Sequence, residues 1–297
     1  MTSSKNYMTE IRRRLLVTVP LLFAFSISIF SQAAQERTVT VFGAKINYVE
    51  AGDAAKPTVI LLHGLGGSTA NWQFNIAPLS QSYHVIAIDQ IGFGKSDRPL
   101  LKYRVGTYVD FLDKFMSELK IEKASLVGNS LGGWVAAWTA IKYPNRVNKI
   151  VLADAAGLKP SDVDLNLVYS LNYSTRDEVR ALVKMVFYNQ ALFGSDAFVE
   201  ESMRVRVAAN DGYTINSLIE SIKRGEDFLN GRLGEIKKPT LIIWGKQDGL
   251  LKLSDGEQFN REIAGSELAV FDQCGHVPQV EKALDFNKRV LEFIAKN

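Results

Sequence analysis

The sequence predicts an α/β protein in which helices flank a mostly parallel sheet of eight strands. Short apolar runs alternate with longer segments of helical spacing from Val39 onward, as in that fold class. Five runs (TVILL, VIAID, ASLVG, KIVLAD and TLIIWG) are continuous, which is typical of strands covered on both faces. The chain has 297 residues, of which 46% are hydrophobic and 23% charged, so it can bury a sizeable core.

The first 33 residues have the composition of an export signal. Lys5 and the arginines at 12–14 precede an uncharged apolar run over 15–30, and SQA at 31–33 supplies the small residues that a signal peptidase needs. We therefore expect an exported protein, periplasmic or secreted, cleaved after about Ala33. The alternative is an uncleaved N-terminal membrane anchor, because the uncharged stretch continues to Gln35 and about 20 residues can span a bilayer.

The charge balance gives no reason to expect a nucleic-acid partner. Residues 1–33 hold four basic residues and one acidic residue, which accounts for the whole net charge of +3 and leaves the rest of the chain neutral. No basic cluster elsewhere points to nucleic acid. Cys274 is the single cysteine, which excludes an intramolecular disulfide.

The predicted strands divide into an antiparallel edge and a parallel centre. The first two alternate apolar and polar residues, which suits an edge hairpin, whereas the later ones are continuously apolar. The expected strands are 38–42, 46–50, 58–62, 85–89, 125–127, 150–153, 240–244 and 268–271. The expected helices are about 69–79, 107–119, 131–143, 255–263 and 281–295, the fourth beginning at the capping box SDGE of 254–257.

One long segment interrupts the alternation of strands and helices. Residues 158–233 contain no buried-strand run, but TRDEVRALVKMVFY opens with a capping box from Thr175 to Glu178 and has an apolar helical stripe. We therefore expect a helical cap at 158–233, inserted after the sixth strand into a core made of 34–157 and 234–297. Ordinary crossover helices are the alternative, although about 75 residues exceed the usual length of such a connection.

The stretch LVGNSLGGW at 126–134 predicts a nucleophile. A serine raised clear of a sheet must lie on a sharp turn between a strand and a helix, and neighbouring side chains would collide there. Gly128 and Gly132, two positions to either side of Ser130, remove that collision. Ser130 is therefore the candidate nucleophile.

A serine needs a base that takes its proton and an acid that orients the base. Of the three histidines, His276 lies in a loop after the last strand, at the sheet edge where Ser130 is expected. His63 and His84 are disfavoured, and we expect His63 to orient a loop. The candidate acid is Asp248, after the strand TLIIWG.

Two other aspartates also follow strands. Asp154, which ends IVLAD, is the alternative acid. We expect Asp89, at the start of DQIGFGKSD, to anchor its own loop.

The candidate oxyanion hole consists of two backbone amides. One belongs to Leu131, directly after the nucleophile, and the other to Leu65 in the loop HGLGG. This chemistry requires no cofactor and no metal.

These motifs together resemble the α/β-hydrolase superfamily over essentially the whole mature chain. The residues that carry the resemblance are HGLGGS, DQIGFGKSD, VGNSLGGWVAAWTAIKYP, LIIWGKQDGLL and CGHVPQVEKALDFN, and the order Ser130, Asp248, His276 is the order of that family. The resemblance implies the α/β-hydrolase fold and a serine hydrolase acting through an acyl-enzyme. Serine at 130 disfavours the haloalkane dehalogenases and epoxide hydrolases, which resemble this chain but use aspartate there.

Within the superfamily the chain is similar to esterases, lipases and meta-cleavage product hydrolases, which cut carbon–carbon bonds. The latter usually carry tryptophan after the histidine and GPG in the oxyanion loop, where this chain has Val277 and LGG. We therefore expect an exported carboxylesterase or lipase-like enzyme acting on a small-molecule ester. The alternatives are a carbon–carbon bond hydrolase and a ligand-binding protein with little turnover. Four aromatic residues of the predicted cap are candidates for either the pocket or the cap core: Phe187, Tyr188, Phe193 and Phe198.

Overall fold

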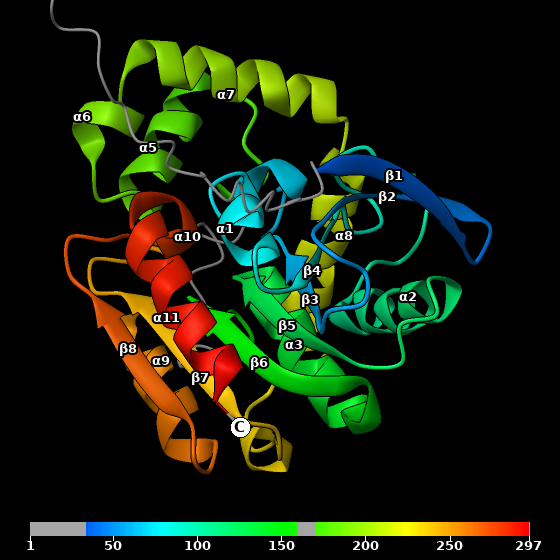
Figure 1. Ribbon diagram of the computed structural model, residues 1–297. Helices are drawn as coiled ribbons and strands as arrows, with labels where there is room; N and C mark the ends of the chain where they lie inside the picture. The colour runs from blue at the N-terminus through cyan, green and yellow to red at the C-terminus, as the bar shows by residue number, and fades with distance from the viewer. Residues whose placement is uncertain (1–33, 160–169, 297) are drawn as a thin grey trace, which may run out of the picture. The chain divides into compact units, whose positions relative to one another are not determined.

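The structure is a computed structural model that describes residues 34–159 and 170–296 (Figure 1). Its eight-stranded sheet has the order β1-β2-β4-β3-β5-β6-β7-β8. The strands are β1 (Gln35–Val41), β2 (Ala44–Ala51), β3 (Thr58–Leu62), β4 (His84–Ile88), β5 (Ala124–Asn129), β6 (Val147–Ala153), β7 (Thr240–Gly245) and β8 (Glu267–Phe271). β2 pairs antiparallel with β1 and β4, and all other pairs are parallel. The predicted edge hairpin and parallel centre are confirmed.

Helices cover both faces of the sheet, which explains why the central strands are continuously apolar. In β3, Ile60 and Leu62 belong to the core cluster on one face and Val59 and Leu61 to the cluster on the other. The first cluster includes side chains of α2 (Val105–Glu118), α3 (Leu131–Lys142) and α9 (Leu253–Glu262), and the second includes side chains of α1 (Ile76–Ser80) and α11 (Ala283–Ala295). The predicted fold class is therefore confirmed.

One helix predicted as a single element is broken. Residues 69–79 form a 3-10 turn, η2 (Thr69–Trp72), followed by α1. The helix predicted at 281–295 is confirmed as α11, and a separate helical turn, α10 (Pro278–Glu281), precedes it. The buried side chain of Asn75, between η2 and α1, donates hydrogen bonds to Asn287 Oδ1 at 2.8 Å and to the carbonyl oxygen of Gln279 at 3.1 Å. These tertiary hydrogen bonds fix Asn75 in a position that a continuous helix over 69–79 would not give it.

The two predicted capping boxes have different outcomes. The box at Thr175 is confirmed, because the Thr175 amide donates to Glu178 Oε2 at 2.9 Å and the Glu178 amide donates to Thr175 Oγ1 at 3.3 Å. The box at 254–257 is wrong. α9 begins at Leu253 after the extended residue Lys252, so SDGE lies inside the helix.

The segment between β6 and β7 contains the helices α5 (Arg176–Val186), α6 (Gln190–Phe193), α7 (Asp196–Ala209) and α8 (Gly212–Lys223). The 3-10 turn η4 (Leu233–Glu235) follows them. Figure 1 shows α5, α6 and α7 grouped together beyond the ends of the central strands. The end of α5 contacts loops at the carboxyl edge of the sheet, since the amides of Gly249 and His276 donate to the carbonyls of Met185 and Val186 at 3.0 and 2.7 Å.

Parts of two predictions lie outside the described residues. The export signal at 1–33 is one, and residues 160–169 of the predicted cap are the other. Within 34–159 and 170–296, no helix has the length and apolarity that crossing a membrane requires.

Candidate active site

Ser130 lies on a strained turn between β5 and α3. Its backbone has φ 55° and ψ −117°, in the left-handed half of conformational space that side chains rarely occupy. A Cβ added at Gly128 would lie 2.2 Å from the carbonyl oxygen of Gly132, and one added at Gly132 would lie 2.0 Å from that of Leu62. The turn therefore requires glycine at both flanking positions.

His276 and Asp248 form a hydrogen-bonded pair. Nδ1 of His276 lies 2.7 Å from Oδ2 of Asp248. The other carboxylate oxygen, Oδ1, accepts the backbone N–H groups of Leu250 at 2.8 Å and Leu251 at 3.0 Å. The Asp248 side chain is 0% exposed and that of His276 is 6% exposed. The loops after β7 and β8 thus place an oriented imidazole in a site sheltered from water.

A cavity of about 280 Å³ brings Ser130 and His276 together, since both line its wall. Leu65 and the glycines beside it line the same wall. A Cβ added at Gly64 would lie 3.2 Å from Cβ of Ser130, so this loop passes directly against the serine. Leu131 is the first residue of α3, where a helix leaves its backbone amides unused. Leu65 and Leu131 thus remain the candidate oxyanion donors.

The other two histidines have structural contacts. His63 is fully buried; its Nε2 accepts the backbone N–H of Gln90 at 3.0 Å, so Nδ1 carries the proton and donates to the carbonyl of Gly64 at 2.7 Å. Burial lowers the pKa of His63, which keeps the ring neutral. His63 thus holds the loop that contains Leu65. His84 instead bonds to Glu50 on the neighbouring strand β2.

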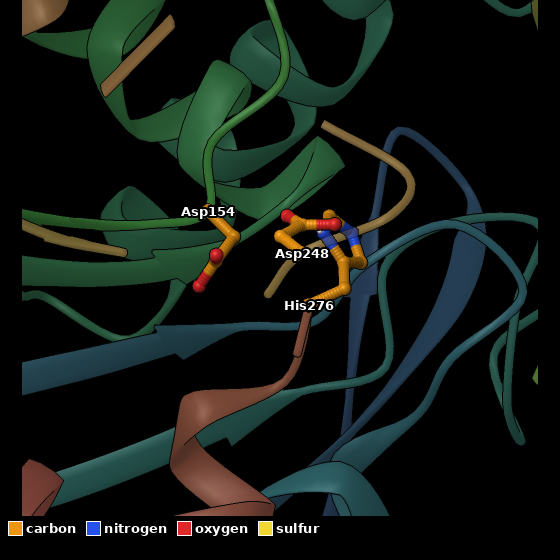
Figure 2. Close-up of side chains that lie close together, drawn as sticks. All are labelled: Asp154, Asp248 and His276. Atoms are coloured by element: carbon orange, nitrogen blue, oxygen red, sulfur yellow. Dashed lines mark hydrogen bonds and ion pairs between the residues drawn. The ribbon is translucent and has the colours of Figure 1, made fainter. Parts of the chain in front are cut away.

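Asp89 and Asp154 also have clear positions. Asp89 anchors its loop, as its carboxylate accepts the amides of Thr69 at 2.6 Å and Lys95 at 2.8 Å. Asp154 lies at the end of β6, close to Asp248 and His276, as Figure 2 shows. The structure pairs His276 with Asp248, and the Oδ1 atom of Asp154 accepts the N–H of Gly245 at 2.8 Å.

Asn129 is a positioning residue that the sequence reasoning missed. Its buried side chain donates from Nδ2 to the carbonyl oxygens of His276 at 3.0 Å and Ala153 at 3.1 Å. It therefore ties the turn that carries Ser130 to the loop that carries His276. The only sequence signal was a carboxamide at the end of an otherwise apolar strand.

The rest of the cavity wall is mainly apolar and comes mostly from the helices between β6 and β7. Phe187 and Phe198 line it, Phe193 stacks on Phe187 with ring centroids 4.0 Å apart, and Tyr188 is exposed. The other apolar lining residues include Leu171, Tyr173, Val179, Leu182, Val183, Val186, Ile215, Leu250 and Val277.

Arg206 is a charged residue in this wall that the sequence reasoning also missed. Its guanidinium forms an ion pair with the buried carboxylate of Asp211 and a hydrogen bond with Asn172. The cavity therefore presents a charge that is already neutralised.

Comparison with known proteins identifies the family. The family model described as the alpha/beta hydrolase fold matches residues 57–283. The 2-hydroxy-6-oxo-6-phenylhexa-2,4-dienoate hydrolase of Comamonas testosteroni is 34% identical over 269 residues, which cover 84% of this chain and 91% of that protein. The 2-hydroxy-6-oxononadienedioate/2-hydroxy-6-oxononatrienedioate hydrolase of Escherichia coli K12 is 33% identical over 284 residues, which cover 90% and 98%. The crystal structure of a membrane phospholipase A, described as a bacterial virulence factor, superimposes with a TM-score of 0.79 and 29% identity over 88% of this chain and 86% of that one. The chain belongs to the alpha/beta hydrolase fold family.

Proposed function

We propose that this hydrolase is an exported serine esterase that cleaves carboxylic esters with neutral, apolar acyl groups. The observation that carries the proposal is the common cavity of Ser130 and His276, whose wall is mainly apolar and whose arginine is already paired with Asp211. An apolar acyl chain fits such a wall without leaving a buried charge unpaired.

The proposed reaction uses these groups in turn. Nε2 of His276 takes the proton of Ser130 Oγ as the oxygen attacks the ester carbonyl carbon. The amides of Leu65 and Leu131 hold the negative oxygen of the tetrahedral intermediate. His276 then gives its proton to the oxygen of the leaving alcohol, and the acyl group stays on Ser130. Water, deprotonated by His276, attacks the acyl-enzyme and releases the acid.

Asp248 supports both steps in which His276 gains a proton. Its carboxylate bonds to Nδ1 at 2.7 Å, which fixes the tautomer that leaves Nε2 free to act as a base. The same carboxylate stabilises the imidazolium that forms during attack. Asp248 is itself held in place by two backbone amides, so this orientation costs no rearrangement during the reaction.

Carbon–carbon bond hydrolysis is the second candidate. It is favoured by the two relatives named as dienoate and dienedioate hydrolases, at 34% and 33% identity. The phospholipase A neighbour and Val277, which lines the cavity directly after the histidine, favour an ester instead. Both candidates use the same serine and histidine and differ in the bond that breaks.

A substrate panel separates the two functions. We expect p-nitrophenyl esters of increasing acyl length to be hydrolysed with a kcat/KM at least about 100-fold above that for a 2-hydroxy-6-oxo-dienoate. Ser130→Ala is the control for turnover that does not pass through the serine. The reverse ratio, abolished equally by Ser130→Ala, overturns the ester proposal and supports carbon–carbon cleavage. Stoichiometric binding of the ester with little turnover supports the ligand-binding alternative.

Export is tested separately on the full chain. We expect the expressed protein to be found outside the cytoplasm, with a new N-terminus near residue 34 on sequencing. Recovery in the membrane fraction with residues 1–33 intact supports the anchor alternative. Full retention in the cytoplasm contradicts both.

A further inference from the structure

Asp154 is a buried acid beside the pair of Asp248 and His276 that the proposed reaction does not use. Its side chain is completely buried at the end of β6. An oxygen of its carboxyl group, an oxygen of Asp248 and a ring nitrogen of His276 all lie within 4.8 Å of one another. Figure 2 shows these side chains coming together from three separate segments. At such distances in a buried site, the protonation state of Asp154 must affect the other two groups.

The available hydrogen-bond donors decide which of the two acids carries the negative charge. Asp248 accepts two backbone N–H groups and also bonds to Nδ1 of His276. Asp154 accepts one backbone N–H at Oδ1, from Gly245, and no donor of the described residues reaches its buried Oδ2. Two adjacent buried carboxylates do not both ionise. The charge therefore belongs on Asp248 and the proton on Asp154.

The surroundings of Asp154 also favour its neutral form. Burial, followed by the charge of Asp248, raises the pKa of Asp154 well above its ordinary value, and Glu281 adds a further negative charge nearby. Cys274 lies among the same groups; burial raises the pKa of its thiol, while Lys282 opposes that effect. The thiol is therefore neutral at physiological pH and does not compete for the charge.

We propose that Asp154 is a positioning residue whose protonated carboxyl group donates a hydrogen bond from Oδ2 to Asp248 and holds that carboxylate against His276. No bond to the substrate forms or breaks at Asp154, and its proton stays on it throughout the cycle. Because the hydrogen bond withdraws electron density from Asp248, its loss should change the pH dependence of the reaction. The inference rests on the serine-hydrolase chemistry proposed above and holds for either substrate class.

Two substitutions of similar size separate the contributions of Asp154. Asp154→Asn keeps a neutral donor, because its amide N–H replaces the carboxyl O–H and its oxygen can still accept from Gly245. Asp154→Leu removes both the donor and the acceptor. Circular dichroism and thermal unfolding establish that each variant is folded before its kinetics are compared.

The first readout is the pH dependence of kcat/KM for a p-nitrophenyl ester. We expect Asp154→Asn to stay within about threefold of the wild type, with an unchanged midpoint on the acidic limb. Asp154→Leu should lose about tenfold or more, the effect of removing one hydrogen bond to a charged group, and its acidic midpoint should move to higher pH. A lower acidic midpoint in Asp154→Asn overturns the proposal, because it shows that a negative charge has been removed. Equal profiles for the two variants also overturn it.

The second readout requires neither activity nor the leucine variant. At pH 8 exposed carboxyl groups are ionised, so a protonated buried acid gives an isolated carbonyl band in the infrared spectrum. We expect that band in the wild type and its loss in Asp154→Asn. Its absence from the wild type overturns the proposal. Because the band is measured without substrate, an enzyme that fails on every ester still leaves this test decisive.

Discussion

Replacing Asn129 with alanine should disconnect the nucleophile turn from the histidine loop. The Asn129 side chain donates to the carbonyl oxygens of Ala153 and His276. The Ala153 carbonyl keeps a second donor, the N–H of Ser130 at 3.0 Å. For the His276 carbonyl, the amide of Asn129 is the donor that the described residues supply, so Asn129→Ala leaves that buried oxygen unpaired.

The size of the effect follows from this one orphaned carbonyl. A buried polar group without a partner costs about 1–3 kcal/mol, and we expect the free energy of unfolding to fall by that amount. For a domain of this size, each kcal/mol corresponds to about 2–4 °C in the melting temperature. Activity should fall more steeply, by about ten- to a hundredfold in kcat, because small displacements of a catalytic base are costly.

The assay pairs urea unfolding with steady-state ester hydrolysis. Asn145→Ala, at an exposed position, is the matched control and should change stability by less than about 0.5 kcal/mol. Wild-type stability together with wild-type kcat in Asn129→Ala would show that the link between the two loops contributes nothing.

Three further predictions concern packing, pH and specificity. Gly132→Ala should unfold the chain or lower its stability by more than about 3 kcal/mol, since the new Cβ would lie 2.0 Å from the carbonyl oxygen of Leu62; a soluble, fully active variant contradicts this. Folding raises the pKa of Asp154, so between its unfolded and folded pKa values the folded chain keeps a proton that the unfolded chain releases. As the pH rises through that range, the stability of the wild type relative to Asp154→Asn should fall by about 1.4 kcal/mol per pH unit. Urea midpoints from pH 5 to 8 measure this slope, and parallel curves refute it. Asp211→Asn should leave the charge of the Arg206 guanidinium without its partner. The kcat/KM for esters whose acyl chain ends in a carboxylate should then rise about tenfold relative to that for esters with a neutral acyl chain. An unchanged ratio contradicts the view that Asp211 neutralises the cavity wall.

The strands and the candidate site residues were predictable because their signals are local. The run at 58–62 is apolar throughout and becomes β3, buried by clusters on both faces. Glycines flank Ser130 within the same short stretch, and His276 and Asp248 each follow a recognisable strand. Because α/β folds build their sites at the carboxyl ends of the parallel strands, these residues could be expected at one edge of the sheet.

What the sequence did not reveal depends on long-range contacts. Asn129 and His276 are 147 positions apart, so no local pattern indicates their hydrogen bond. The break between η2 and α1 depends on Asn75 meeting Asn287, which is 212 positions away. The ion pair of Arg206 and Asp211 is closer in sequence, but its burial in the cavity wall depends on how α7 and α8 pack.

One labelling experiment shows whether Ser130 is the nucleophile of an ester hydrolase. A fluorophosphonate should attach once per chain, at Ser130 by mass spectrometry, and abolish ester turnover in proportion to labelling. Ser130→Ala should neither label nor turn over ester, with kcat lower by about four orders of magnitude or more. Ser125→Ala, which changes a buried serine on the preceding strand β5, should label normally. Full turnover by a folded Ser130→Ala variant, or labelling at another residue, would contradict the account.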